Sequence, residues 1–150
     1  MKNIPKYVFR GTTINYEGGS SSQKCEYTCT TKHPVIAALF ALLCAQEYPE
    51  QSVVYIFKTI KLKSLKPMGN VLKKHEEELA WPVLPKDMLE LSEGYVDILD
   101  MKKVLNDFQV IVDPIVSVDN LTRLCKEATS MSDTEIETIV KALEALIKKS

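Results

Sequence analysis

An arginine near the N-terminus has the surroundings of a ligand-binding residue. Arg10 ends an alternating stretch of aromatic and β-branched residues, which predicts a short strand over 6–10, and Gly11 follows it. A guanidinium donates N–H groups in a fixed fork that suits phosphate or carboxylate oxygens. Glycine lets a backbone or a ligand approach closely. An ordinary salt-bridged surface arginine is the alternative for this pair alone.

Short polar side chains gather at the predicted junction between a second strand, over 25–31, and a helix. The members that can reach a ligand are Tyr27, Cys29, Thr30 and Thr31. Hydroxyls in this position can cap the helix, bind a ligand or orient a catalytic carboxylate. Capping explains one threonine but does not explain the crowding.

The helix after this junction is predicted over 35–47 and is apolar on almost all sides, so we expect it to pack deeply against a sheet. Pro34 suits its first turn, and Thr31 or Lys32 is expected near the N-cap. His33 is expected to be an exposed residue at the helix start. Phe40 can pack in the core or against a ligand ring.

Three consecutive glutamates run into a short apolar stretch, residues 79–83. If the segment is extended, the side chains of Glu76 and Glu78 point to the same side. A carboxylate at the margin of a sheet is partly desolvated and can act on a substrate. The alternative is the charged, solvated end of a helix.

In their order and spacing, these three stretches resemble the arginine–serine–glutamate branch of the mono-ADP-ribosyltransferase superfamily, known from bacterial toxins and phage enzymes. The matching motifs are Phe9-Arg10-Gly11, residues 29–31 with Pro34, Ala37 and Phe40-Ala41 behind them, and residues 76–82. The resemblance covers about residues 5–85. Cys29 stands where the family has its first serine, unless the register shifts by one residue and Thr28 takes that place.

The resemblance implies an enzyme that uses NAD as its substrate and needs no metal. Arg10 would contact the phosphates or the adjacent ribose, and backbone groups near Gly11 would bind the nicotinamide amide. Tyr27 or Phe40 would stack near the nicotinamide ring. The acceptor would be a protein side chain, with arginine as the first expectation.

The catalytic roles follow from the same resemblance. Cys29, Thr30 and Thr31 would hold the nicotinamide ribose and position Glu78. Glu78 would stabilise the oxocarbenium-like transition state as nicotinamide leaves. Glu76 would orient or deprotonate the acceptor.

The remaining elements predict an α+β fold in a single domain, residues 1–150. Residues 52–58 form a continuous apolar run typical of a central strand, residues 59–66 continue it with alternation, and 109–118 suggest one or two further strands. Helices are expected over 117–126 and 131–149. The resemblance implies a split β-sandwich with flanking helices and a C-terminal helix, and gives 117–150 no role.

The last helix carries two signals of its own. Ser132 and Glu135 make a capping box at its start. Its apolar residues fall on one stripe that covers the core or a partner: Ile136, Ile139, Val140, Leu143 and Leu146.

Composition narrows the function classes. Nineteen basic and twenty acidic side chains give a net charge of -1, so a nucleic-acid target is not expected. The four cysteines form no C-x-x-C pair, which argues against zinc and for free thiols. No apolar run has the length of a membrane helix or follows the pattern of a signal peptide, so we expect a cytoplasmic protein; any export would need a dedicated secretion system or a phage.

Four alternatives share these observations. An NAD glycohydrolase would use the same site with water as acceptor. A transferase acting on a nucleic acid or a small molecule would use the same scaffold. A non-catalytic relative would bind NAD or a partner without turnover, which the cysteine at position 29 would fit. A regulatory protein would recruit a partner through its C-terminal helix.

Overall fold

The computed structural model describes residues 5–13, 28–46, 51–62, 78–83, 85–108, 116–117 and 119–149. The strands are β1 (Tyr7–Thr13), β2 (Thr28–Thr31), β3 (Ser52–Lys58), β4 (Glu78–Trp81) and β5 (Gly94–Asp97). The helices are α2 (Pro34–Ala45), α3 (Thr59–Leu62), α4 (Pro85–Met88), the 3-10 turn η2 (Leu89–Leu91), α5 (Ile98–Asp107), α6 (Leu121–Ala128) and α7 (Asp133–Glu144). The fold is α+β, as predicted.

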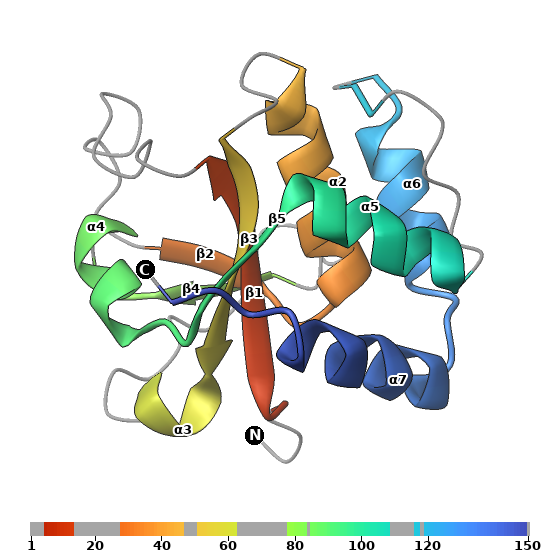
Figure 1. Cartoon of the computed structure of the whole chain (residues 1–150). Coiled ribbons are helices and arrows are strands. Elements are labelled where there is room, and N and C mark those ends of the chain that lie inside the picture. Colours follow the sequence, from red (N-terminus) through yellow and green to blue (C-terminus); the bar gives the residue numbers. More distant parts are fainter. Residues whose placement is uncertain are drawn as a thin grey trace.

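The five strands form one antiparallel sheet in the order β4-β2-β1-β3-β5 (Figure 1). β1 and β3 pair along their whole length, through seven register pairs from Tyr7–Lys58 to Thr13–Ser52. In the described residues β1 and β2 share one pair, Phe9 with Thr31. In Figure 1, β2 and β4 run across the direction of β1 and β3, so the sheet consists of two parts that meet at this single pair.

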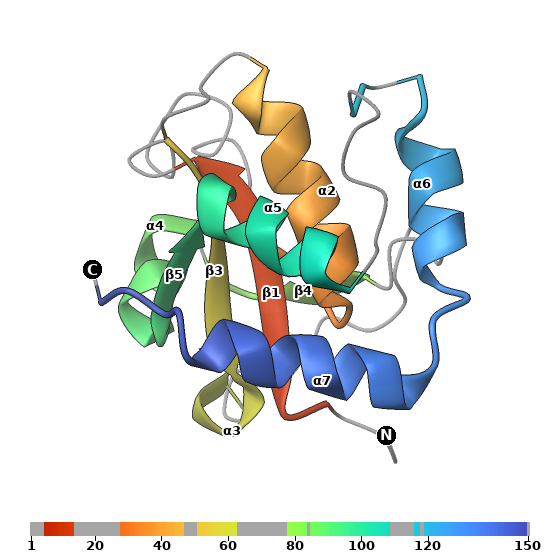
Figure 2. The ribbon, with the colours of Figure 1, turned by 45° about the vertical axis from the view of Figure 1, so that its right-hand side comes forward.

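Each face of the sheet has its own apolar core. On one face α2, α5 and α7 lie over β1 and β3, and α6 packs against α2 (Figure 2); Phe9 and Ile56 belong to this core. On the other face lie Val8, Phe57 and Trp81, together with Leu62 of α3 and Met88 of α4. Since β3 is covered on both sides, its side chains are buried almost throughout. This explains its continuous apolar sequence.

Several predicted elements are confirmed. The strand over 52–58 has the predicted bounds, and α2 occupies the predicted apolar helix, buried along most of its length. β1, β2 and β4 fall within or beside the predicted strands. The expectation of alternating strand after residue 58 is wrong, because the chain turns into α3 at Thr59, whose hydroxyl donates to the carbonyls of Pro5 and Lys6. Most of the predicted strand region 109–118 lies outside the described residues.

His33 is not exposed, and it is the residue that caps α2. Its side chain is 1% exposed, and its Nδ1 accepts from the Val35 amide at 3.2 Å. Its Nε2 therefore carries the proton and donates to the Ala128 carbonyl at 2.8 Å. The N-cap was expected near Thr31 or Lys32 and is the next residue, His33, whose amide donates to the Thr31 hydroxyl. His33 thus joins the start of α2 to the end of α6.

The C-terminal region is confirmed in part. The capping box of Ser132 and Glu135 begins α7 as predicted. The helix ends at Glu144 instead of continuing to residue 149. The chain then turns back, and Lys148 and Tyr95 exchange backbone hydrogen bonds of 2.9 and 2.8 Å. These bonds extend the edge of the sheet beyond β5.

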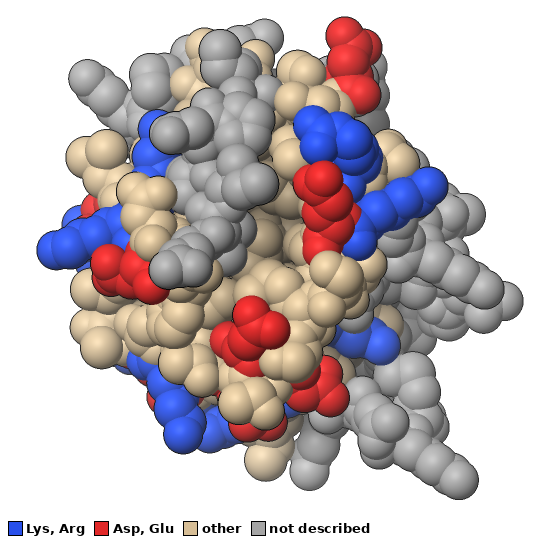
Figure 3. Space-filling view, turned by 90° about the vertical axis from the view of Figure 1, so that its right-hand side faces the viewer, with Lys and Arg blue, Asp and Glu red and all other residues tan. Residues whose placement is uncertain are grey.

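Two properties concern the chain as a whole. None of the helices in the described ranges has the length and apolar character needed to cross a membrane. Figure 3 shows the face formed by the helices, where basic and acidic side chains are interspersed. No patch of a single sign covers the described part of that face.

Candidate functional site

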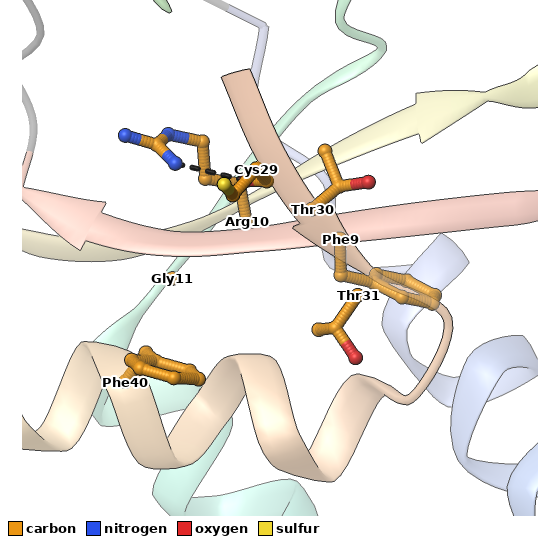
Figure 4. A pocket seen from close by; sticks show the side chains of 7 residues that line it. All are labelled: Phe9, Arg10, Gly11, Cys29, Thr30, Thr31 and Phe40. Atoms are coloured by element: carbon orange, nitrogen blue, oxygen red, sulfur yellow. Dashed lines mark hydrogen bonds between the residues drawn. The ribbon is translucent and has the colours of Figure 1, made fainter. Parts of the chain in front are cut away.

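A pocket of about 110 Å³ opens between β1, β2 and α2. Its lining residues, drawn in Figure 4, are Phe9, Arg10, Gly11, Cys29, Thr30, Thr31 and Phe40. Six of these were predicted as site residues from the sequence. The structure therefore brings two of the three predicted stretches, and Phe40 of the helix behind them, to one place.

The pocket exists because two neighbouring strands diverge. β1 and β2 pair at Phe9 and Thr31, and no further register pair joins them in the described residues. Arg10 and Gly11 continue along β1 with β3, while Thr30 and Cys29 continue along β2 with β4. The space between the separating strands is the pocket, and Phe40 of α2 lies across it from Arg10 (Figure 4).

Arg10 bridges the gap between these strands. Its side chain is half-buried, and Nη1 donates to the backbone carbonyl of Cys29 at 2.8 Å (Figure 4). A guanidinium thus joins the two strands at the point where their backbone ladder has ended. The bond fixes the positive charge at the edge of the pocket.

The hydroxyls of Thr28 and Thr30 in β2 form hydrogen bonds within the protein. Thr28 donates to the Val83 carbonyl at 2.7 Å. Thr30 donates to the Leu79 carbonyl and accepts from the indole N–H of Trp81, both at 3.0 Å. Trp81 is 1% exposed and belongs to the core. These bonds attach β4 to β2 beyond what the strand ladder provides.

Gly11 is required by helix packing whether or not a ligand binds. A Cβ at this position would lie 1.9 Å from the Ala37 carbonyl oxygen and 2.7 Å from the Ala41 amide nitrogen. Both atoms belong to the backbone of α2. The glycine therefore allows β1 and α2 to pack closely on one side of the pocket.

Glu78 is the first residue of β4 and is placed here by its backbone alone. It pairs in register with Thr31, which in turn pairs with Phe9. Adjacent strands lie about 4.8 Å apart, so the backbone of Glu78 is about 10 Å from β1 at the pocket. Glu76 and Tyr27, which were predicted to take part, lie outside the described residues.

Phe9 is the lining residue that sequence reasoning assigned no role. It belongs to the resemblance motif, but its contribution here is packing, because it is 1% exposed and lies in the core beneath α2. The alternation of β1 carries the signal, since residues 7, 9 and 11 must share one face.

No group of three or more metal-ligating side chains occurs in the part of the chain that is described. No disulfide involves Cys29, Cys44 or Cys125 in the described residues. Comparison with protein-family models, with curated proteins and with solved structures gives no match. The function must therefore be argued from the pocket.

Proposed function

We propose that the chain is an NAD-dependent mono-ADP-ribosyltransferase that transfers ADP-ribose to a protein side chain and releases nicotinamide. The observation that carries the proposal is the pocket itself. Arg10-Gly11 and residues 29–31 were selected from the sequence as parts of one site, and they line one cavity with Phe40. Their meeting place is the point where β1 and β2 separate.

The size of the pocket supports a ring-binding role. An engineered cavity of about 150 Å³ binds benzene, so a space of about 110 Å³ has the scale of one six-membered ring. A nicotinamide ring matches this scale, with Phe40 on one wall. The rest of the dinucleotide would extend past Arg10, whose charge suits its phosphates.

Contacts around β4 support the role proposed for the predicted carboxylate. The Thr30 hydroxyl holds the Leu79 carbonyl, one residue after Glu78. Because Trp81 anchors the other end of β4, this strand is fixed at both ends of its short length. The segment 29–31 would thus position Glu78 through the backbone of β4.

Cysteine in place of serine at position 29 leaves one contact of the pocket unchanged. The contact from Arg10 reaches the backbone carbonyl of Cys29, which any residue provides. The exchange of a hydroxyl for a thiol therefore leaves the bridge between β1 and β2 intact.

The proposed reaction breaks the bond between the ribose C1′ and the nicotinamide nitrogen. Nicotinamide leaves with the bonding electron pair, and positive charge develops on the ribose. The carboxylate of Glu78 would stabilise this charge. A nucleophilic nitrogen of the acceptor then bonds to C1′ and loses its proton, which Glu76 would accept.

The test is nicotinamide release from NAD by the wild type and by Glu78→Gln. We expect release by the wild type and a loss of about 10²–10³ in rate in the variant, as for other preorganised electrostatic contacts. Glu90→Gln is the matched control, because Glu90 is an exposed carboxylate on η2. Equal rates for wild type and Glu78→Gln would refute the catalytic role.

The acceptor is tested with labelled NAD and a cell lysate. Label on protein supports transfer. Free labelled ADP-ribose without labelled macromolecule would indicate an NAD glycohydrolase instead of a transferase. Binding of NAD without turnover would replace it by a non-catalytic relative.

A further inference from the structure

A second and larger cavity lies between the start of β1 and α7. Its volume is about 360 Å³, within the range of about 300–1,000 Å³ typical of ligand sites. In Figure 2, α7 crosses in front of the lower end of β1, near the N-terminus. We call this cavity the α7 groove; its apolar part is formed by Tyr7, Phe9, Ile136 and Val140.

The apolar residues of α7 differ in how far the core covers them. Ile139 and Leu143 are fully buried in the core. Ile136 and Val140, one turn apart, are only half-buried and line the α7 groove. The stripe predicted to cover either the core or a partner therefore divides into two, and its outer half forms part of an open surface.

The rim of the α7 groove carries three lysines and two glutamates, so positive charge is in excess by one: Lys6, Lys32 and Lys141 against Glu137 and Glu144. Glu144 is occupied by a hydrogen bond with Tyr7, and burial together with this carboxylate raises the pKa of Tyr7. The Lys6 ammonium lies 5.4 Å from the centroid of the Tyr7 ring. Lys32 and Lys141 also line the groove, and neither forms an ion pair with another residue in the described ranges.

The α7 groove adjoins the candidate site. Phe9 lines both cavities, and Lys32 of the groove directly follows Thr31 of the pocket. A molecule held in the groove would therefore have its neighbouring parts beside the pocket. Binding energy from such a remote contact can orient a reactive group.

We propose that the α7 groove docks the acceptor protein, through an extended segment in which acidic and apolar side chains alternate. This inference rests on the proposed transferase function. In an extended segment alternate side chains point to opposite sides. The apolar ones would cover Ile136 and Val140, while the acidic ones would pair with Lys32 and Lys141.

The docking chemistry is tested without NAD. Fluorescence anisotropy would compare a short labelled peptide of alternating Glu and Leu with one of alternating Lys and Leu. We expect the acidic peptide to bind about tenfold more tightly or better, and Lys32→Glu/Lys141→Glu to abolish that preference. Lys102→Glu/Lys103→Glu on α5 is the matched control, because both of its lysines are exposed and lie outside the groove.

Equal binding of the two peptides would overturn the proposal, and so would equal losses in the two charge-reversal variants. Thermal melting of all variants shows whether the charge reversals keep the fold. With labelled NAD and lysate, the ratio of protein labelling to nicotinamide release should fall about tenfold in Lys32→Glu/Lys141→Glu and stay unchanged in the control. An unchanged ratio in both overturns docking, whereas absent nicotinamide release in the wild type overturns the transferase function instead.

Discussion

Gly11→Ala tests whether the glycine of the motif is a packing residue. The new Cβ would lie 1.9 Å from the Ala37 carbonyl oxygen, whereas real Cβ contacts are essentially never shorter than 3.0 Å. β1 and α2 would have to separate by about 1 Å. Overpacking of a well-packed core costs about 1–3 kcal/mol and occasionally more. Because the obstacle is backbone of the most buried helix, we expect a loss of about 3 kcal/mol.

The assay is urea unfolding followed by circular dichroism, which gives the free energy of unfolding. A second variant, Gly11→Ala/Ala37→Gly, identifies the obstructing atom. It removes the Ala37 methyl group but keeps the carbonyl oxygen, so the stability should not recover. A loss below about 0.5 kcal/mol for Gly11→Ala would refute the packing argument, and so would recovery in the double variant.

Three further predictions concern stability. The hydrogen bond from Lys61 outweighs burial and lowers the pKa of Glu93, whose side chain is 12% exposed. The stability that the charged Glu93 contributes is present at neutral pH and is lost as the pH falls below about 4. Glu93→Gln should therefore cost about 1 kcal/mol at pH 7 and flatten the acid limb of a pH–stability curve. His33 makes two side-chain hydrogen bonds, one at the start of α2 and one to the Ala128 carbonyl. His33→Asn keeps an acceptor for the first and His33→Gln a donor for the second, so in urea unfolding each should lose about 1 kcal/mol and His33→Ala about 2–3 kcal/mol. Equal losses for all three variants would contradict this account. Gly94 has φ +126°, and a Cβ there would lie 2.2 Å from the backbone oxygen of Lys148. Gly94→Ala should therefore detach the C-terminal segment and speed hydrogen exchange of the Tyr95 amide, which donates to that oxygen. Unchanged exchange would refute this prediction.

The sequence predicted best those elements whose signal is local. The apolar run 52–58 is a strand because both its faces are covered, and the capping box at Ser132 begins α7 as expected. His33 was misplaced because its burial depends on the Ala128 carbonyl, which is 95 residues away along the chain. The end of α7 was missed for a similar reason, since residues after Glu144 gain backbone bonds to β5 that helical propensity does not reveal.

The candidate site shows the same division. Motif spacing indicated which residues would meet, and Arg10, Gly11 and the segment 29–31 line one pocket. It did not indicate that the Thr30 hydroxyl donates to the Leu79 carbonyl of β4, nor that only glycine at position 11 leaves room for the backbone of α2. Both roles depend on tertiary packing, which a local sequence pattern does not reveal.

Several motif positions with a proposed chemical role also have a structural role, and this affects what a substitution at each position can show. A protein with this fold would keep Gly11 and Thr30 even if it bound no dinucleotide, because α2 and β4 require them. Arg10 also has a structural bond to β2, so its loss would disturb the pocket as well as any phosphate contact. Glu78 differs, because its position opposite Thr31 is set by the backbone register of β4. Glu78→Gln keeps that backbone and the size of the side chain while removing the charge, so a loss of turnover in this variant without a loss of stability is the result that would separate chemistry from architecture.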